Sequence, residues 1–398
     1  MIHWLLAIIY LAFISLGLPD ALLGSAWPSM YQELSVPVSY SGIIFMLIAG
    51  GTIVSSLQSD RLTKRFGTGK VTAVSVLLTA TALLGFSFSH SYLALCLWAV
   101  PYGLGAGSVD ASLNNYVALH YASRHMSWLH CMWGIGASLG PYVMGYALTG
   151  GQSWNMGYRA IAFLQIGLTA VLFISLPLWD RQGKGDAGQG AEDAREKPLS
   201  LRQVLKIPGA KEIMITFFCY CALEQTANLW AGSYLVLHQG LSAQEAAGQA
   251  GLFFAGITVG RFLSGFLTWR LNDTQMIRLG QALIAAGILA FFLPLGELSS
   301  LAGLALIGLG CAPIYPSIIH ATPARFGKHR SQAMIGVQMA FAYIGTCVMP
   351  AVFGLLADHV SVSLLPYDLL LILVLMVVMH ERMLPKTAAS RNGKAAAK

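Results

Sequence analysis

Charged side chains are scarce in this chain of 398 residues. Asp, Glu, Lys and Arg make up 10% of the residues and hydrophobic residues 56%, and the mean hydropathy is +0.64. A water-soluble surface needs many more charged groups than this, so the composition fits no soluble class of protein. The scarcity of charge therefore excludes a soluble fold and indicates a chain that lies mostly within a lipid bilayer.

Several motifs of cofactor and metal sites are also missing. The six cysteines lie in apolar segments without Cys-x-x-Cys spacing, so we expect neither disulfides nor a bound metal. The run Gly103-x-Gly105-x-Gly107 lies inside an apolar segment with no strand before it, which excludes a nucleotide loop. We expect no cofactor, and any transport must then be driven by an ion gradient, of protons or of sodium, or by the gradient of the solute itself.

Long apolar runs occupy nearly the whole sequence. Each is long enough to cross a hydrocarbon core of roughly 30 Å as a helix. The sequence therefore predicts an all-α membrane protein with twelve transmembrane helices. The predicted spans are 4–31, 38–58, 70–89, 92–119, 127–149, 158–179, 211–238, 246–269, 274–296, 299–320, 330–357 and 362–383.

The basic residues follow the predicted topology. The net charge of +7 could indicate a nucleic-acid partner, but all except two of the 24 Lys and Arg residues fall in or beside alternate loops. The exceptions are Arg159 and Arg261. By the positive-inside rule, this distribution predicts that both termini face the cytoplasm, and it argues against a nucleic-acid partner. The first span lacks the basic start of a signal peptide and carries Pro19 and Asp20, so we expect it to be retained.

A polar, glycine-rich stretch divides the predicted helices six and six. We expect an N-terminal six-helix bundle at 1–179, a cytoplasmic linker at 180–210, a C-terminal bundle at 211–384 and a basic tail at 385–398. Small-residue motifs recur between the two halves at nearly constant offsets of 205 or 209, which predicts a pseudosymmetric internal repeat. The matching pairs are Gly51 with Gly256, Gly103 with Gly308, and Gly136 with Gly345.

Four ionisable residues lie near the middle of predicted membrane helices: Asp20, Asp110, Glu224 and Arg261. Charged groups are costly at this depth and usually mark an ion or substrate pathway. A carboxyl group in a medium of low dielectric can take up a proton, which suits it to carry the coupling ion. The alternative is structural, with Glu224 and Arg261 forming a fixed ion pair that orders the C-terminal half.

The segment after the second span, Asp60-Arg61-Leu-Thr-Lys64-Arg65, resembles the signature loop of the major facilitator superfamily, although Ser56 replaces its leading glycine. This resemblance implies that Asp60, Arg61, Lys64 and Arg65 latch the cytoplasmic ends of neighbouring helices. The alternative is an ordinary positively charged inner loop.

Two further segments, LGLPDALLGSAWP at 16–28 and GLGAGSVDASLNNYV at 103–117, resemble the fucose/proton symporter family within that superfamily. This resemblance implies a monomeric, proton-coupled sugar carrier of the cell's inner membrane, with Asp20 and Asp110 in the coupling roles. The sequence departs from the fucose carrier at Asp110, where the carrier has Glu, and at Asn114-Asn115, where the family usually has Ala-Asn-Pro. Fucose itself is therefore not implied.

A sugar needs hydrogen-bonding groups for its hydroxyls and an aromatic face for its ring. His130 is either a further proton site or a neutral imidazole that bonds between helices. Packing or lipid contact is the alternative for each aromatic residue, and Asn114 and Asn115 could instead join helices. The candidate substrate residues are Trp27, Asn114, Asn115, Trp133, Gln225, Asn228, Trp230, Tyr315, Gln338 and Tyr343.

Short motifs in the sequence also suggest two other functions. A proton-coupled exporter of drugs or metabolites is suggested by Gly136 to Pro141, which resembles the glycine-proline end of the antiporter motif. An intramembrane aspartyl protease is suggested only by Tyr367-Asp368 and lacks the Gly-x-Gly-Asp motif of its second catalytic aspartate, so we expect no enzyme activity.

Overall fold

A computed structural model describes residues 2–150, 153–185, 198–241, 243–294 and 296–396. It divides the chain into two compact units. Unit 1 comprises Met1–Tyr116 and Leu129–Leu199, and unit 2 comprises Val117–Trp128 and Ser200–Lys398. The units differ from the predicted halves in the short segment Val117–Trp128, whose contacts lie within unit 2 although the helices on either side of it belong to unit 1.

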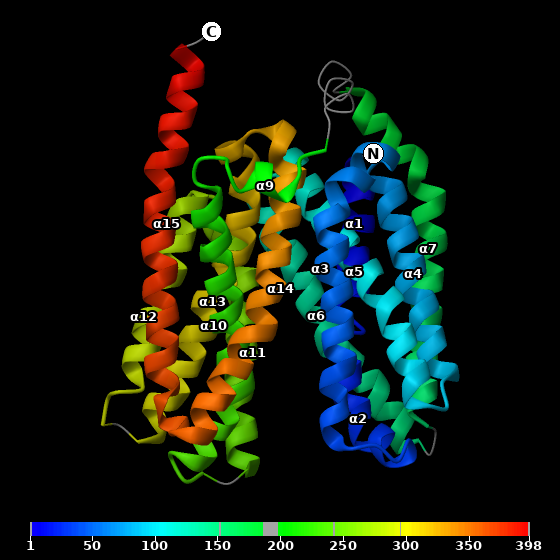
Figure 1. Cartoon of the computed structure of the whole chain (residues 1–398), viewed down its shortest axis with the longest axis vertical. Coiled ribbons are helices and arrows are strands. Elements are labelled where there is room, and N and C mark those ends of the chain that lie inside the picture. The colour runs from blue at the N-terminus through cyan, green and yellow to red at the C-terminus, as the bar shows by residue number, and fades with distance from the viewer. Residues whose placement is uncertain (1, 151–152, 186–197, 242, 295, 397–398) are drawn as a thin grey trace. The chain divides into compact units, whose positions relative to one another are not determined.

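Unit 1 is a helical bundle whose first membrane segment is split into two helices. Trp4–Glu33 contains both pieces and is long and apolar enough to cross a membrane. Within the unit, α4 packs against α7, and α7 also contacts α1 (Figure 1). Its elements are α1 (Ile2–Gly17), α2 (Leu22–Glu33), η1 (Val38–Tyr40), α3 (Ser41–Phe66), α4 (Thr68–Phe88), α5 (Tyr92–His120), α6 (Ser123–Thr149) and α7 (Trp154–Gly185).

Unit 2 is a second helical bundle. The main packing pairs are α12 with α13, α10 with α14, α11 with α13, and α10 with α15. Figure 1 shows α15 extending beyond its neighbours in this unit toward the C-terminus. Its elements after residue 200 are α9 (Leu201–Val204), α10 (Ala210–Leu237), α11 (Ala243–Leu267), α12 (Asp273–Ala290), α13 (Glu297–Phe326), α14 (Lys328–His359), η2 (Val362–Leu364) and α15 (Leu365–Ala396).

Each predicted span corresponds to a helix or, for the first span, to the pair α1 and α2. Eight segments of the described chain meet a strict test of length and hydropathy for crossing a membrane. The helix ends differ from the prediction. Helix α7 continues to Gly185, inside the predicted linker, and α15 continues through the predicted tail, whereas α12 stops at Ala290. The centre of the predicted linker, 186–197, lies outside the described residues.

The predicted repeat coincides with equivalent helix crossings in the two units. A Cβ atom added at Gly103 would lie 2.1 Å from the carbonyl oxygen of Ile48, and one added at Gly308 would lie 2.2 Å from that of Phe253. The first contact joins α3 to α5 and the second joins α11 to α13. Small residues permit this backbone approach, which is a common way for membrane helices to pack.

The third pair of the repeat behaves in the same way. A Cβ atom at Gly136 would lie 2.0 Å from the carbonyl oxygen of Ile14, and one at Gly345 would lie 2.5 Å from that of Phe218. These contacts join α1 to α6 and α10 to α14. The sequence repeat thus encodes the same close contacts twice, once in each unit.

The break between α1 and α2 exposes the side chain of Asp20. Proline has no backbone N–H, and it disfavours helical geometry in the residue before it, here Leu18. Short turns replace the regular helix at this point: the backbone N–H of Asp20 donates to Gly17 O over 3.1 Å, and that of Leu22 donates to Pro19 O over 3.1 Å. The side chain of Asp20 is consequently presented from an irregular turn instead of a helix face.

Candidate functional site

Asp20 accepts hydrogen bonds from two other helices of unit 1. The indole Nε1 of Trp133 on α6 donates to Asp20 Oδ2 over 2.8 Å, and the hydroxyl of Tyr102 on α5 donates to Oδ1 over 3.4 Å. The Asp20 side chain is exposed, whereas Tyr102 is buried. This carboxyl group is therefore oriented by fixed donors while remaining accessible.

Asp110 belongs to a second polar network in the same unit. The side-chain amide nitrogen of Asn114 donates to Asp110 Oδ1 over 2.8 Å and to the Asp110 backbone carbonyl over 3.0 Å. Asn114 Oδ1 lies 3.1 Å from His130 Nε2. With its nitrogen used as a donor, the amide accepts through its oxygen, so His130 carries a proton on Nε2 in this arrangement. Both Asn114 and His130 are buried.

The two networks of unit 1 meet on α6. His130 and Trp133 are three residues apart, so they lie on neighbouring positions of one helix face. That face packs closely on α1: a Cβ atom added at Gly17 would lie 2.1 Å from the backbone oxygen of Trp133, and the ring of Phe13 meets that of His130 edge-on at 5.5 Å. The contact between α1 and α6 thus holds both networks in place.

In unit 2, Glu224 and Arg261 form the ion pair that the sequence suggested. Arg261 Nη2 lies 3.5 Å from Glu224 Oε1, with side chains 4% and 20% exposed respectively. Aromatic rings lie next to the pair along α10 and α13. Tyr220 and Tyr315 approach edge-to-face at 6.0 Å, and Phe217 and Tyr315 at 4.7 Å. A nearly buried cation, a partly accessible acid and amphipathic rings are thus gathered in one unit.

Several predicted substrate residues are engaged in packing. Trp27 donates to Val38 O over 2.7 Å, and Trp230 donates to Pro350 O over 2.9 Å. Gln338 is fully buried and accepts from Thr322. These three side chains have partners within the protein, and their roles in substrate binding stay predictions.

The other substrate candidates differ in accessibility. Asn115 is buried. Tyr315 donates to the sulfur of Met339 over 3.0 Å. Their roles stay predictions, as they do for the three candidates that remain partly accessible: Gln225, Asn228 and Tyr343.

The segment from Asp60 to Arg65, which the resemblance predicts to latch neighbouring helices, lies at the C-terminal end of α3. Asp60 is buried, and its Oδ2 accepts both from Lys64, over 3.2 Å, and from the backbone N–H of Leu199, over 3.2 Å. Arg61 donates to Gln58 over 3.2 Å, and Arg65 lies over the Phe66 ring at 5.2 Å. Asp60 thus anchors the chain just before α9. This contact could not be predicted from the sequence because it joins positions 139 residues apart.

Tyr102 is another residue that sequence reasoning missed. It precedes the glycine-rich run of α5, and only the helix packing reveals that it reaches Asp20.

The described residues contain no cluster of three or more His, Cys, Asp or Glu side chains that could hold a metal ion.

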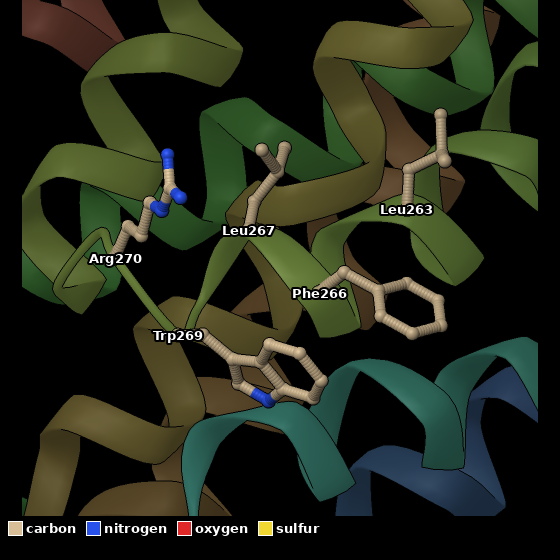
Figure 2. A pocket seen from close by; sticks show the side chains of 5 residues that line it. All are labelled: Leu263, Phe266, Leu267, Trp269 and Arg270. Carbon is tan, nitrogen blue, oxygen red and sulfur yellow. The ribbon is translucent and has the colours of Figure 1, made fainter.

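A surface hollow of about 350 Å³ lies at the end of α11 and in the following turn. Figure 2 shows the rings of Phe266 and Trp269 on one side and the guanidinium of Arg270 pointing away from them. Leu263 and Leu267 complete the lining. None of the predicted coupling or substrate residues contributes to this hollow.

Comparison with known proteins identifies relatives along the whole chain. The family model described as Major Facilitator Superfamily matches residues 9–301 and 250–398. The chain is 25% identical over 397 residues to the sodium-dependent glucose transporter 1A of Mus musculus, covering 88% of this chain and 89% of that protein. It is 21% identical over 391 residues to the gallate transporter of Pseudomonas putida, covering 89% and 86%.

Solved structures show the same fold. The fucose:proton symporter of E. coli superposes with a TM-score of 0.71 at 14% sequence identity, covering 95% of this chain and 98% of that one. The predicted resemblance to that symporter is confirmed at the level of fold, and with it the expected architecture of twelve helices in two bundles.

Proposed function

Because the chain belongs to the Major Facilitator Superfamily, we propose that it carries a sugar together with protons across the membrane by alternating access. It is a transporter and not an enzyme, as its family establishes. The sugar, the proton coupling and the roles of individual residues are the proposal. The observation that supports this proposal is the position of Asp20 in the break between α1 and α2. Its side chain is accessible and accepts hydrogen bonds from Trp133 and Tyr102.

Asp20 has the properties required of a coupling group. In the middle of a membrane segment the charged carboxylate is unfavourable unless it is hydrogen-bonded or protonated. The N–H of Trp133 and the hydroxyl of Tyr102 stabilise the ionised form, and loss of either contact favours uptake of a proton. Binding of a sugar hydroxyl at Asp20 would compete for these contacts. Solute binding and proton binding would thereby be coupled at one carboxyl group.

Asp110 is the second proposed coupling group. Asn114 and His130 hold it in a buried chain of hydrogen bonds. Any change in the protonation of Asp110 therefore alters how α5 and α6 bond to each other. This connects proton uptake to the position of α6, which also carries Trp133.

The charges of the proposed coupling residues, taken unit by unit, favour a neutral solute over a carboxylate. Of the proposed coupling residues only Arg261 is a permanent cation, and Glu224 neutralises it at 3.5 Å. Asp20 and Asp110 add negative charge whenever they are ionised. An aromatic acid, as implied by the name of the gallate transporter, would meet no uncompensated cation among these residues. A polyhydroxylated solute instead finds acceptors, donors and the ring of Trp133.

The proposal includes orientation and assembly. We place both termini in the cytoplasm and the chain in the inner membrane as a monomer. The support for the orientation is the distribution of basic residues, with all but Arg159 and Arg261 in or beside predicted inner segments.

Purified protein in proteoliposomes tests the function. With an imposed inward proton gradient, we expect one member of a panel of hexoses, pentoses and disaccharides to accumulate, and gallate not to do so. Accumulation that follows a sodium gradient alone would contradict the choice of ion. Proton-driven expulsion of the solute would favour the exporter instead.

The variant Asp20→Asn tests the coupling role. We expect it to abolish accumulation against a gradient while exchange of labelled for unlabelled solute continues. The matched control is Asp358→Asn, which removes an acid at the end of α14 that lies outside the candidate site. Undiminished accumulation by a correctly inserted Asp20→Asn protein would refute the assignment without excluding sugar transport.

A further inference from the structure

A basic cavity lies between α10 and α15 of unit 2, and none of the proposed coupling or substrate residues lines it. Its volume is about 560 Å³. Three cationic side chains and one acidic side chain line it, Lys211, Arg382, Lys386 and Glu212. The remaining lining is apolar, from Ile215, Met379 and Pro385.

Two of the three cations are available to an anionic ligand. Lys386 pairs with Glu212. Lys211 and Arg382 are exposed, and neither makes a hydrogen bond or ion pair within the part of the chain that the structure describes. The cavity therefore carries a net charge of about two positive units, from one lysine and one arginine on adjacent helices. Arg382 can bind two oxygens of a phosphate in a bidentate geometry.

An exposed apolar stripe leads along α15 to this cavity. Leu371, Val374 and Val378 are 69%, 52% and 40% exposed. They are spaced by three and four residues, and Arg382 follows four residues after Val378, so all four lie along one helix face. In a membrane-spanning helix, such a stripe contacts the hydrocarbon of the bilayer. The cationic cavity thus stands where that apolar face ends.

We propose that this cavity binds the headgroup of an anionic phospholipid, with an acyl chain lying along the stripe of α15. The phosphate would lie between Lys211 and Arg382, while Ile215 and Met379 would contact the first carbons of the chain. Basic pockets between transmembrane helices bind anionic headgroups for this electrostatic reason. A soluble acidic protein matches the charge but not the stripe, which lies within the bilayer.

Native mass spectrometry of the detergent-purified protein tests the site, with phosphatidylglycerol and phosphatidylcholine of identical acyl chains as probes. We expect retention of phosphatidylglycerol in excess of phosphatidylcholine. Each cation next to an anionic lipid changes the binding affinity about fivefold. The double variant Lys211→Gln/Arg382→Gln removes two cations and should therefore weaken phosphatidylglycerol binding about 25-fold. The matched control, Arg202→Gln with Lys328→Gln, removes two exposed cations elsewhere in unit 2 and should have little effect.

A second measurement uses the wild-type protein alone. Phosphatidylglycerol should raise its thermal unfolding midpoint more than phosphatidylcholine does, because a ligand that binds the folded state stabilises it. Equal retention of the two lipids, or equal loss in the control variant, would overturn the proposal. So would equally tight binding of the soluble headgroup glycerophosphoglycerol, since the acyl chain would then contribute nothing.

Discussion

Substitution of Gly136 by alanine perturbs the contact that holds both polar networks of unit 1. The added Cβ atom would lie 2.0 Å from the carbonyl oxygen of Ile14. Cβ atoms essentially never lie closer than 3.0 Å to such an atom, so α1 and α6 must separate by about 1.0 Å. The obstructing atom belongs to the backbone and cannot rotate away. The strain must therefore be relieved by movement of a whole helix.

This separation is large compared with the hydrogen bond that it affects. Trp133 Nε1 and Asp20 Oδ2 are 2.8 Å apart, and a shift of about 1.0 Å along the bond would bring them to about 3.8 Å, beyond hydrogen-bonding distance. Overpacking costs about 3 kcal/mol at such a site, and the better helix propensity of alanine returns about 1 kcal/mol. We expect a net destabilisation of about 2 kcal/mol and a large loss of concentrative uptake.

Thermal unfolding in detergent and proton-driven uptake in proteoliposomes measure the two effects. The matched control is Gly145→Ala on the same helix, where an added Cβ atom meets nothing within 4 Å. It should be neutral or stabilising by about 1 kcal/mol and should leave uptake intact. If Gly136→Ala matches the wild type in both measurements, the contact between α1 and α6 does not support the candidate site as described.

Two further predictions concern ion pairs. Glu224→Gln removes the counter-ion of Arg261, whose side chain is 4% exposed, and should lower the free energy of unfolding by about 3 kcal/mol. The double variant Glu224→Gln/Arg261→Gln should regain most of that stability. A double variant as unstable as the single one would argue against the pair. Asp60→Asn removes the charge paired with Lys64 and weakens the bond to Leu199, so we expect a lower transport rate with unchanged apparent affinity, measured as initial uptake against solute concentration. A changed affinity with an unchanged rate would contradict the role of Asp60 as an anchor.

Most of the architecture could be predicted because it depends on local sequence. Apolar runs long enough to cross a bilayer identify the helices, and the repeated glycines mark the crossings at which backbones touch. The sequence also suggests that Glu224 pairs with Arg261, as the alternative to a coupling role, because the two residues lie on successive helices. These features need little knowledge of how distant helices are arranged.

The partners of individual polar groups could not be predicted in the same way. Asn114 was a candidate substrate ligand, yet both ends of its amide bond to Asp110 and His130. Trp27 and Trp230 have rings of the kind that stack on sugars, but their indole N–H groups donate hydrogen bonds to backbone carbonyls. Such outcomes depend on the rotation of each helix about its axis. A sequence pattern shows which broad face of a helix is apolar, but it does not define the rotation closely enough to identify the partner of one side chain.

The hydrogen bond between Asp60 and Leu199 limits what the chain before α9 can do. Leu199 is the last residue of unit 1, and Ser200, the next residue, already forms the capping box of α9 with Gln203. A single peptide bond therefore separates Leu199, which is anchored to α3, from the capping box of α9. While this hydrogen bond persists, the backbone at Leu199 stays fixed to the end of α3, so a substitution at Asp60 acts directly on the residue next to the capping box of α9.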